Sequence, residues 1–149
     1  MTEEDLVDLV QAEEEKPAWT FAQFAEELHH PYGWQLVAFT REPYQFGGYI
    51  CCRSVAGEAE ILKIAVTSPF RGQGVGSLLL QAAVTRMVEE KATRCYLEVR
   101  DSNIVAKGLY EKFGFRQIGH RKGYYSSPRE DAIVYKLGLA KRCTGEEKR

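Results

Sequence analysis

The stretch from residue 60 to residue 99 constrains the fold most, because its periodicity changes twice around a glycine-rich loop. Residues 60–66 are almost continuously apolar apart from Lys63, which is typical of a strand near the centre of a sheet. Apolar residues then recur at helical spacing over 77–90, and residues 95–99 are again strand-like. A strand, a helix and a second strand in this order predict a right-handed crossover between parallel strands.

The rest of the chain extends this unit into a larger sheet, whose first and last strands we expect to be antiparallel. Further strands are expected over residues 34–40, 47–55, 115–125 and 132–137, and further helices over 2–15, 20–29 and 103–113. The sequence therefore predicts one α/β (α+β) domain over residues 1–139. It would contain a mixed, mostly antiparallel sheet with one central parallel βαβ unit and about four flanking helices. Residues 140–149 are expected to form a flexible charged tail.

Composition and charge exclude several classes of protein. The chain has 149 residues, of which 44% are apolar, and a formal net charge of -1, so neither DNA nor a membrane is expected as a partner. The four cysteines form no C-x-x-C pair, so neither a metal site nor a disulfide framework is expected. The acidic N-terminus does not resemble a signal peptide, and no stretch reaches the ~20 apolar residues that span a bilayer. We expect a cytoplasmic protein that is a monomer or a weak dimer.

The glycine-rich loop has the chemistry of an anion site. Its sequence is Arg71-Gly72-Gln73-Gly74-Val75-Gly76. Glycines let backbone amides approach a ligand closely, and the helix that follows offers unpaired N–H groups and a positive dipole end, which suits a pyrophosphate. The spacing fails the dinucleotide pattern G-x-G-x-x-G, and no Lys-Ser or Lys-Thr pair completes a P-loop. The simpler alternative is a tight turn, but three glycines in five residues exceed what a turn requires.

This loop, preceded by Ile64-Ala65-Val66, resembles the coenzyme-A-binding motif R/Q-x-x-G-x-G/A of GNAT acetyltransferases. The resemblance implies a GNAT fold in which the loop amides hold the pyrophosphate of acetyl-CoA. It also implies that the preceding strand aligns the pantetheine arm and that a backbone amide near Val66 faces the thioester carbonyl as an oxyanion donor. GNAT proteins usually open with a strand, whereas the first expected helix here begins almost at Met1, so we expect that first strand to be absent or very short.

A second stretch carries the remaining resemblance. Alternation on the strand over 95–99 places Tyr96, Glu98 and Arg100 on the face opposite Cys95, Leu97 and Val99. The residues from Leu97 to Asn103 and from Leu109 to Phe115 resemble the RimI-like branch, which acetylates the N-terminal alanine of a small-subunit ribosomal protein.

That resemblance implies roles for three residues, and each has a structural alternative. Glu98 would be the general base, or an ion-pair partner of Arg100 or another cation. Tyr110 would be the acid that protonates the coenzyme A thiolate, or a packed aromatic residue. Asn103 would contact the pantetheine arm, or cap its own helix. The expected cofactor-binding residues are Ile64, Ala65, Val66, Arg71, Gly72, Gln73, Gly74, Val75, Gly76, Asn103 and Tyr110.

The acceptor side rests on family analogy alone. Five residues are expected to line a groove for a protein or peptide N-terminus, and each has a plain alternative as a surface or turn residue: Glu60, Tyr124, Tyr125, Glu130 and Asp131. An α-amine loses its proton far more easily than a lysine, since the ordinary pKa values of the two groups are ~7.7–8.0 and ~10.4. A GNAT enzyme acting on lysine or a small amine remains an alternative, as does a non-catalytic module that senses acetyl-CoA.

Overall fold

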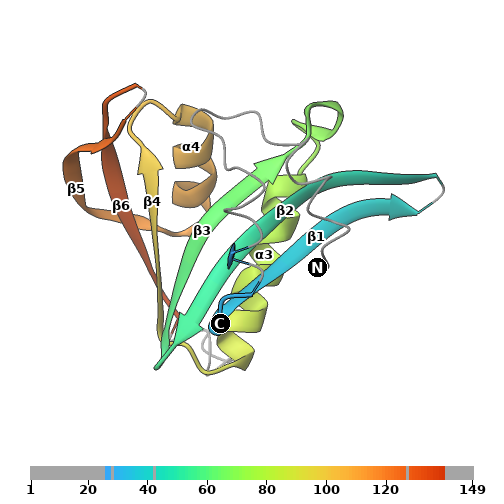
Figure 1. Ribbon diagram of the computed structural model, residues 1–149, viewed down its shortest axis with the longest axis horizontal. Helices are drawn as coiled ribbons and strands as arrows, with labels where there is room; N and C mark the ends of the chain where they lie inside the picture. Colours follow the sequence, from blue (N-terminus) through green and yellow to red (C-terminus); the bar gives the residue numbers. More distant parts are fainter. Residues whose placement is uncertain (1–25, 28, 42, 127, 140–149) are drawn as a thin grey trace. The chain divides into compact units, whose positions relative to one another are not determined.

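The computed structural model describes residues 26–139 except residues 28, 42 and 127 (Figure 1). Within them six strands form one sheet in the order β1-β2-β3-β4-β6-β5. The elements are β1 (Gly33–Arg41), β2 (Tyr44–Val55), β3 (Glu58–Val66), the 3-10 helix η1 (Ser68–Phe70), α3 (Val75–Glu89), β4 (Arg94–Arg100), α4 (Ile104–Phe113), β5 (Arg116–Tyr125) and β6 (Glu130–Gly138). Four expectations lie outside the described residues: the helix over 2–15, most of the helix over 20–29, the absent or very short first strand, and the tail over 140–149.

The strand pairing confirms the predicted sheet. β1 with β2, β4 with β6 and β5 with β6 are antiparallel, whereas β3 and β4 are parallel. β3 is the third of the six strands, as its apolar sequence indicates. The ladder between β3 and β4 pairs only Glu58–Ile61 with Arg94–Leu97, although β4 continues to Arg100. The edge of β4 from Glu98 onward is therefore outside this ladder.

Several element boundaries differ from the prediction by one to three residues, and two of them have clear local reasons. β2 begins at Tyr44 rather than at residue 47, because the ladder with β1 continues to the Arg41–Tyr44 pair and the rings of Phe39 and Tyr44 lie 5.1 Å apart. α3 begins at Val75 rather than at residue 77. The Leu78 amide donates to the Gly74 carbonyl at 3.0 Å, so the first helical turn already forms inside the glycine-rich loop.

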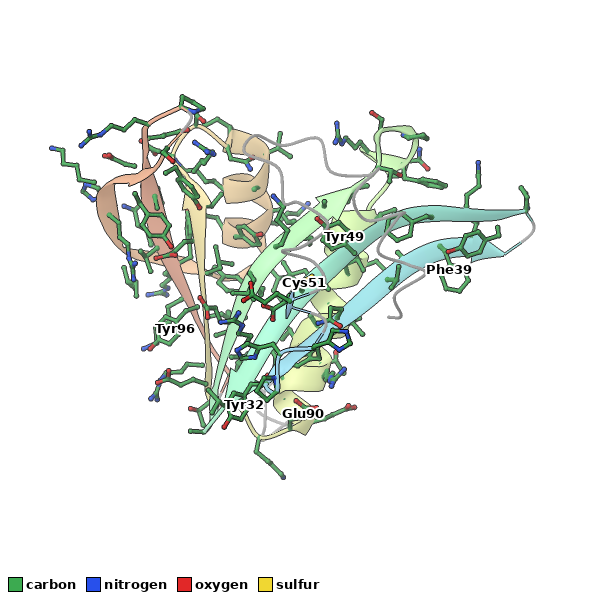
Figure 2. The ribbon with its side chains drawn as sticks, in the orientation of Figure 1. Tyr32, Phe39, Tyr49, Cys51, Glu90 and Tyr96 are labelled. Carbon is green, nitrogen blue, oxygen red and sulfur yellow. The ribbon has the colours of Figure 1, made fainter. Side chains whose placement is uncertain are left out.

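The described residues divide into two compact units, one within 26–53 and 62–85 and the other within 54–61 and 86–139. In the first unit β2 packs on α3. An added Cβ at Gly48 would lie 3.4 Å from the Leu79 side chain of α3. Tyr49 and Cys51, which alternate with Gly48 and so face the other side of β2, are buried too (Figure 2). Glu27 is 4% exposed, and the Arg53 guanidinium donates to both of its carboxylate oxygens. The expectation of a single domain over 1–139 stays a prediction.

In the second unit β4 has two different faces. Cys95, Leu97 and Val99 are buried, and their β6 partners Leu137, Tyr135 and Ile133 are buried with them on the face that α4 covers. Tyr96, Glu98 and Arg100 alternate with them and are only half-buried, as the sequence predicts. Figure 2 labels Tyr96 on this face. No helix of the described residues is long and apolar enough to cross a membrane.

Candidate active site

The glycine-rich loop of the first unit is fastened by its own side chains. The Arg71 Nε donates to the Val66 carbonyl at 3.0 Å, and the Gln73 amide donates to the Pro69 carbonyl at 2.8 Å. At the end of β3 the Thr67 amide donates to the Gly47 carbonyl at 2.9 Å. Two of the side chains expected to bind coenzyme A therefore hold the shape of the loop, and the loop's backbone amides remain the ligand-binding groups of the prediction.

The glycines of this loop are needed for conformation and leave space around them. Gly72 has φ +75° and Gly74 has φ +86°, values that strain any residue with a Cβ. An added Cβ would meet no heavy atom within 4 Å at either position, so the surface of the loop is open there. The four amides before Leu78 have no acceptor within α3, because the first turn of an α-helix leaves them unpaired. Open space beside such amides fits the pyrophosphate of coenzyme A.

In the second unit Glu98 lies on the half-buried face of β4 and is held by a cation from β5. Its side chain is 20% exposed, and its Oε2 lies 2.8 Å from the Arg121 Nε in an ion pair. The guanidinium carbon of Arg121 lies 5.1 Å from the centre of the Tyr124 ring. The ion-pair alternative for Glu98 is therefore realised, with Arg121 rather than Arg100 as the partner.

A bulge in β5 brings both Arg121 and Tyr124 to Glu98. Residues three apart on a regular strand face opposite sides, but the register of β5 and β6 shifts between Arg121 and Tyr125. Gly123 within this shift has φ +61°, and its amide donates to the Asp131 Oδ1 at 2.8 Å. The bulge thus returns Tyr124 to the side of the sheet that carries Glu98.

Two carboxylates act on the Tyr124 hydroxyl. Partial burial raises the pKa of Tyr124, and the charge and hydrogen bond of Glu98 and the charge of Glu60 raise it further, whereas the Arg121 charge lowers it. Glu60 pairs with Tyr96 in the β3–β4 ladder, on the same face of the sheet as Glu98. The structure therefore brings together three of the predicted residues, Glu60, Glu98 and Tyr124, and it adds Arg121 to them.

Tyr110 lies on the other face of β4. It is 5% exposed, and its ring centre lies 5.6 Å from that of Phe115 and 6.4 Å from that of Tyr135, the β6 partner of Leu97. Glu98 and Tyr110 are thus on opposite faces of one strand.

The Tyr135 hydroxyl beside this cluster is also hydrogen-bonded. It donates to the Glu111 Oε2 at 2.6 Å, and burial followed by this hydrogen bond raises the pKa of Tyr135 to about 12. Nothing in the sequence pattern singles out Tyr135 or Glu111, since an alternating strand and a charged helix face are ordinary features.

The remaining predicted residues have structural partners. The Asn103 Oδ1 accepts from the Ala106 amide at 3.1 Å, which confirms the helix cap. Glu130 accepts from the Ser102 amide and from the Arg100 Nη1 at 3.2 Å. Hydrogen bonds from the Ser102 side chain and amide, followed by the hydrogen bond and charge of Arg100, lower the pKa of Glu130. Tyr125 stacks with Arg100, whose guanidinium carbon lies 4.4 Å from the ring centre. The substrate-binding roles of Tyr125, Glu130 and Asp131 stay predictions.

The described residues contain no group of three or more His, Cys, Asp or Glu side chains arranged to hold a metal ion. Cys51, Cys52 and Cys95 form no disulfide bond, and all three are buried. Cys143 lies outside the described residues.

Comparison with known proteins identifies the family. The acetyltransferase (GNAT) family matches residues 1–115. A candidate ribosomal protein bS18-alanine N-acetyltransferase of Bacillus subtilis is 40% identical over 117 residues, which are 78% of this chain and 76% of that protein. The ribosomal protein bS18-alanine N-acetyltransferase of Haemophilus influenzae is 40% identical over 96 residues, 62% of this chain and 65% of that protein. The crystal structure of the ribosomal-protein-S18-alanine N-acetyltransferase from Escherichia coli superposes with a TM-score of 0.83 at 26% identity, over 93% of this chain and 90% of that one. The chain therefore belongs to the acetyltransferase (GNAT) family and is an N-acetyltransferase.

Proposed function

We propose that this chain transfers the acetyl group of acetyl-CoA to the N-terminal α-amine of a protein, with the N-terminal alanine of a small-subunit ribosomal protein as the acceptor. The observation that carries the proposal is the cluster of the half-buried Glu98 with the exposed Glu60 and Tyr124 on one face of the second unit. Two carboxylates around one hydroxyl favour a cationic group, and the protonated α-amine of a peptide is such a group. The relatives' names point to the same class of acceptor.

On the donor side, the loop over residues 71–76 would bind the pyrophosphate through its backbone amides, and Ile64, Ala65 and Val66 would align the pantetheine arm. The open surface at Gly72 and Gly74 supports this fit. Acetyl-CoA would supply the acetyl group as a thioester.

On the acceptor side, Glu98 would take the proton that the amine loses as its nitrogen bonds to the acetyl carbon. The bond between carbon and sulfur breaks, and the Tyr110 hydroxyl would donate a proton to the sulfur. Glu60, Tyr124 and Tyr125 would hold the first residues of the acceptor, with Glu130 and Asp131 near them. An α-amine suits a single carboxylate base, because its ordinary pKa of ~7.7–8.0 leaves a useful fraction neutral at physiological pH.

A thiol-release assay tests this proposal. Purified protein and acetyl-CoA are given a peptide with a free N-terminal alanine, or the same peptide with that end blocked and an internal lysine. Turnover should require the free N-terminus and should fall by about 10²-fold or more in Glu98→Gln and in Tyr110→Phe. Matched controls are Glu90→Gln, in a half-exposed ion pair with Arg86, and Tyr44→Phe, on an exposed tyrosine. Turnover with the blocked peptide would instead indicate a lysine acetyltransferase, and binding of coenzyme A without turnover of any amine would indicate a sensor.

A matched pair of glycine variants tests the role of the loop over residues 71–76 in cofactor binding. Gly57 and Gly74 have similar φ values of +82° and +86°, and neither has a heavy atom within 4 Å of an added Cβ. Gly57→Ala and Gly74→Ala should therefore destabilise the fold to a similar extent. Only Gly74→Ala should weaken coenzyme A binding, measured by calorimetry, and equal affinities in the two variants would contradict the loop assignment.

A further inference from the structure

Arg121 meets Glu98 in an unusual way for a surface arginine. Its side chain is 59% exposed, whereas the Glu98 side chain is 20% exposed, so a largely covered carboxylate receives its cation from the solvent side. The contact is made through the guanidinium Nε of Arg121, at 2.8 Å from the Glu98 Oε2. The same guanidinium lies 5.1 Å from the centre of the Tyr124 ring, a second attractive position for a cation.

The strand order shows how far the arginine extends. Glu98 is on β4 and Arg121 is on β5, and β6 lies between these strands. Neighbouring strands are about 4.8 Å apart, so the side chain crosses β6 before it reaches Glu98. Ala132 is the residue that pairs with both Arg100 on one side and Arg121 on the other, and its short side chain leaves room for this crossing.

We propose that Arg121 is a displaceable counterion of Glu98, which occupies the position at the carboxylate that the ammonium group of the acceptor takes. This inference rests on the proposed function, because it takes Glu98 as the group that meets the amine. Two cations cannot both donate to one carboxylate oxygen at hydrogen-bond distance without repelling each other. Acceptor binding therefore swings Arg121 away from Glu98, towards solvent and the Tyr124 ring.

As a counterion of Glu98, Arg121 opposes acceptor binding, so removing its charge should strengthen that binding and lower the KM. Removing the guanidinium in Arg121→Gln should lower the KM for a peptide with a free N-terminal alanine by about threefold to fivefold, the range of a partly exposed ion pair, with kcat within about twofold of the wild type. Arg121→Lys should keep the wild-type KM, since it restores a cation.

Lys122→Gln is the matched control. Lys122 is the exposed neighbour of Arg121, and its substitution removes the same charge from the same strand. The KM should be unchanged in this variant. A raised KM in Arg121→Gln would overturn the inference, because it would mean that the arginine helps to hold the acceptor. An equal fall of KM in both variants would overturn it too, because net charge alone would then explain the effect.

A second measurement does not depend on turnover. The Nε–H signal of Arg121, observed by NMR with ¹⁵N-labelled arginine and assigned through its loss in Arg121→Lys, should shift in Glu98→Gln. It should shift in the same direction when the wild type is titrated with the free alanine peptide, and not with the N-acetylated peptide.

The two readouts separate the failure of the inference from the failure of the proposed function. If the wild type does not acetylate the peptide but the free amine still shifts the Arg121 signal, only the proposed function fails. If the peptide is acetylated and the signal does not respond to it, the counterion is not displaced and only the inference fails. A signal that is unchanged in Glu98→Gln shows that the ion pair is absent in solution, which also overturns the inference.

Discussion

The bulge that aims Tyr124 at Glu98 depends on one backbone conformation, so Gly123→Ala tests it directly. Gly123 has φ +61°, and the left-handed region costs a residue with a Cβ about 1–2 kcal/mol. An added Cβ would also lie 2.9 Å from the Arg129 guanidinium. This second contact adds little, because the end of a flexible side chain can move aside.

Gly119 on the same strand is the matched control. It has no positive φ, and an added Cβ would meet no heavy atom within 4 Å. At such a position Gly→Ala stabilises by about 0.4–1 kcal/mol, because it reduces the conformational freedom of the unfolded chain. The two alanine variants should therefore differ in free energy of unfolding by about 1.5–3 kcal/mol, with Gly123→Ala the less stable.

Urea denaturation followed by circular dichroism gives the two free energies. The assay for function is the KM for the alanine peptide, which should rise in Gly123→Ala because the variant moves Tyr124 away from Glu98. Equal stability of the two variants would refute the left-handed turn. A stability difference of the expected size with an unchanged KM would retain the turn but refute its role in positioning Tyr124.

Three further predictions concern single side chains of the second unit. Tyr135→Phe should cost about 0.5–1.5 kcal/mol at neutral pH by removing the donor to Glu111. Because the pKa of Tyr135 is raised to about 12 from 10, its contribution is present below pH 10 and is lost as the pH rises towards 12, so urea midpoints of the wild type should fall more steeply over that window than those of the variant. Burial, with the charge of Glu60, raises the pKa of the Cys95 thiol to about 12, so iodoacetamide at about pH 8 should leave Cys95 unmodified until urea unfolds the protein; peptide mass spectrometry showing modification of the folded protein would contradict this. Asn103→Ala should lower the free energy of unfolding by about 1 kcal/mol because it removes the helix cap, whereas Asn103→Asp should keep the cap. Weaker coenzyme A binding in Asn103→Asp would reveal a cofactor contact separate from the cap, and unchanged binding would leave the cap as the role of this residue.

The sequence predicts those parts of the site that follow from the residues of a single loop or strand and its immediate neighbours in the chain. Gly72 and Gly74 have positive φ values in a loop between a strand and a helix, and such glycines are recognisable from their spacing alone. The half-buried position of Glu98 follows from the alternation of apolar and polar residues on β4, which needs no knowledge of the neighbouring strands. The parallel pairing of β3 and β4 follows from the helix that separates them in the sequence.

The partner of Glu98 could not be predicted in this way. Alternation on β5 places Arg121 and Tyr124 on opposite faces, and only the register shift after Arg121 brings both to the same carboxylate. That shift depends on a hydrogen bond from Gly123 to Asp131 on another strand. The Arg121 side chain on β5 has to cross β6 to reach Glu98 on β4, and a contact between strands that are not neighbours leaves no periodic pattern in the sequence.

If Glu98 and Tyr110 are the base and acid of the proposed function, their placement on opposite faces of β4 limits where the reaction occurs. A ligand on either face of the sheet would reach one of the two groups and have β4 between it and the other. The ladder with β3 ends at Leu97, so the edge of β4 beside Glu98 is the place where a reacting centre reaches both faces. Because the proposed base and acid do not share a face or a hydrogen bond, they would act on different atoms of the reacting group. Glu98→Gln and Tyr110→Phe should then lower kcat by factors that multiply in the double variant, whereas a double variant no slower than either single variant would indicate one coupled unit.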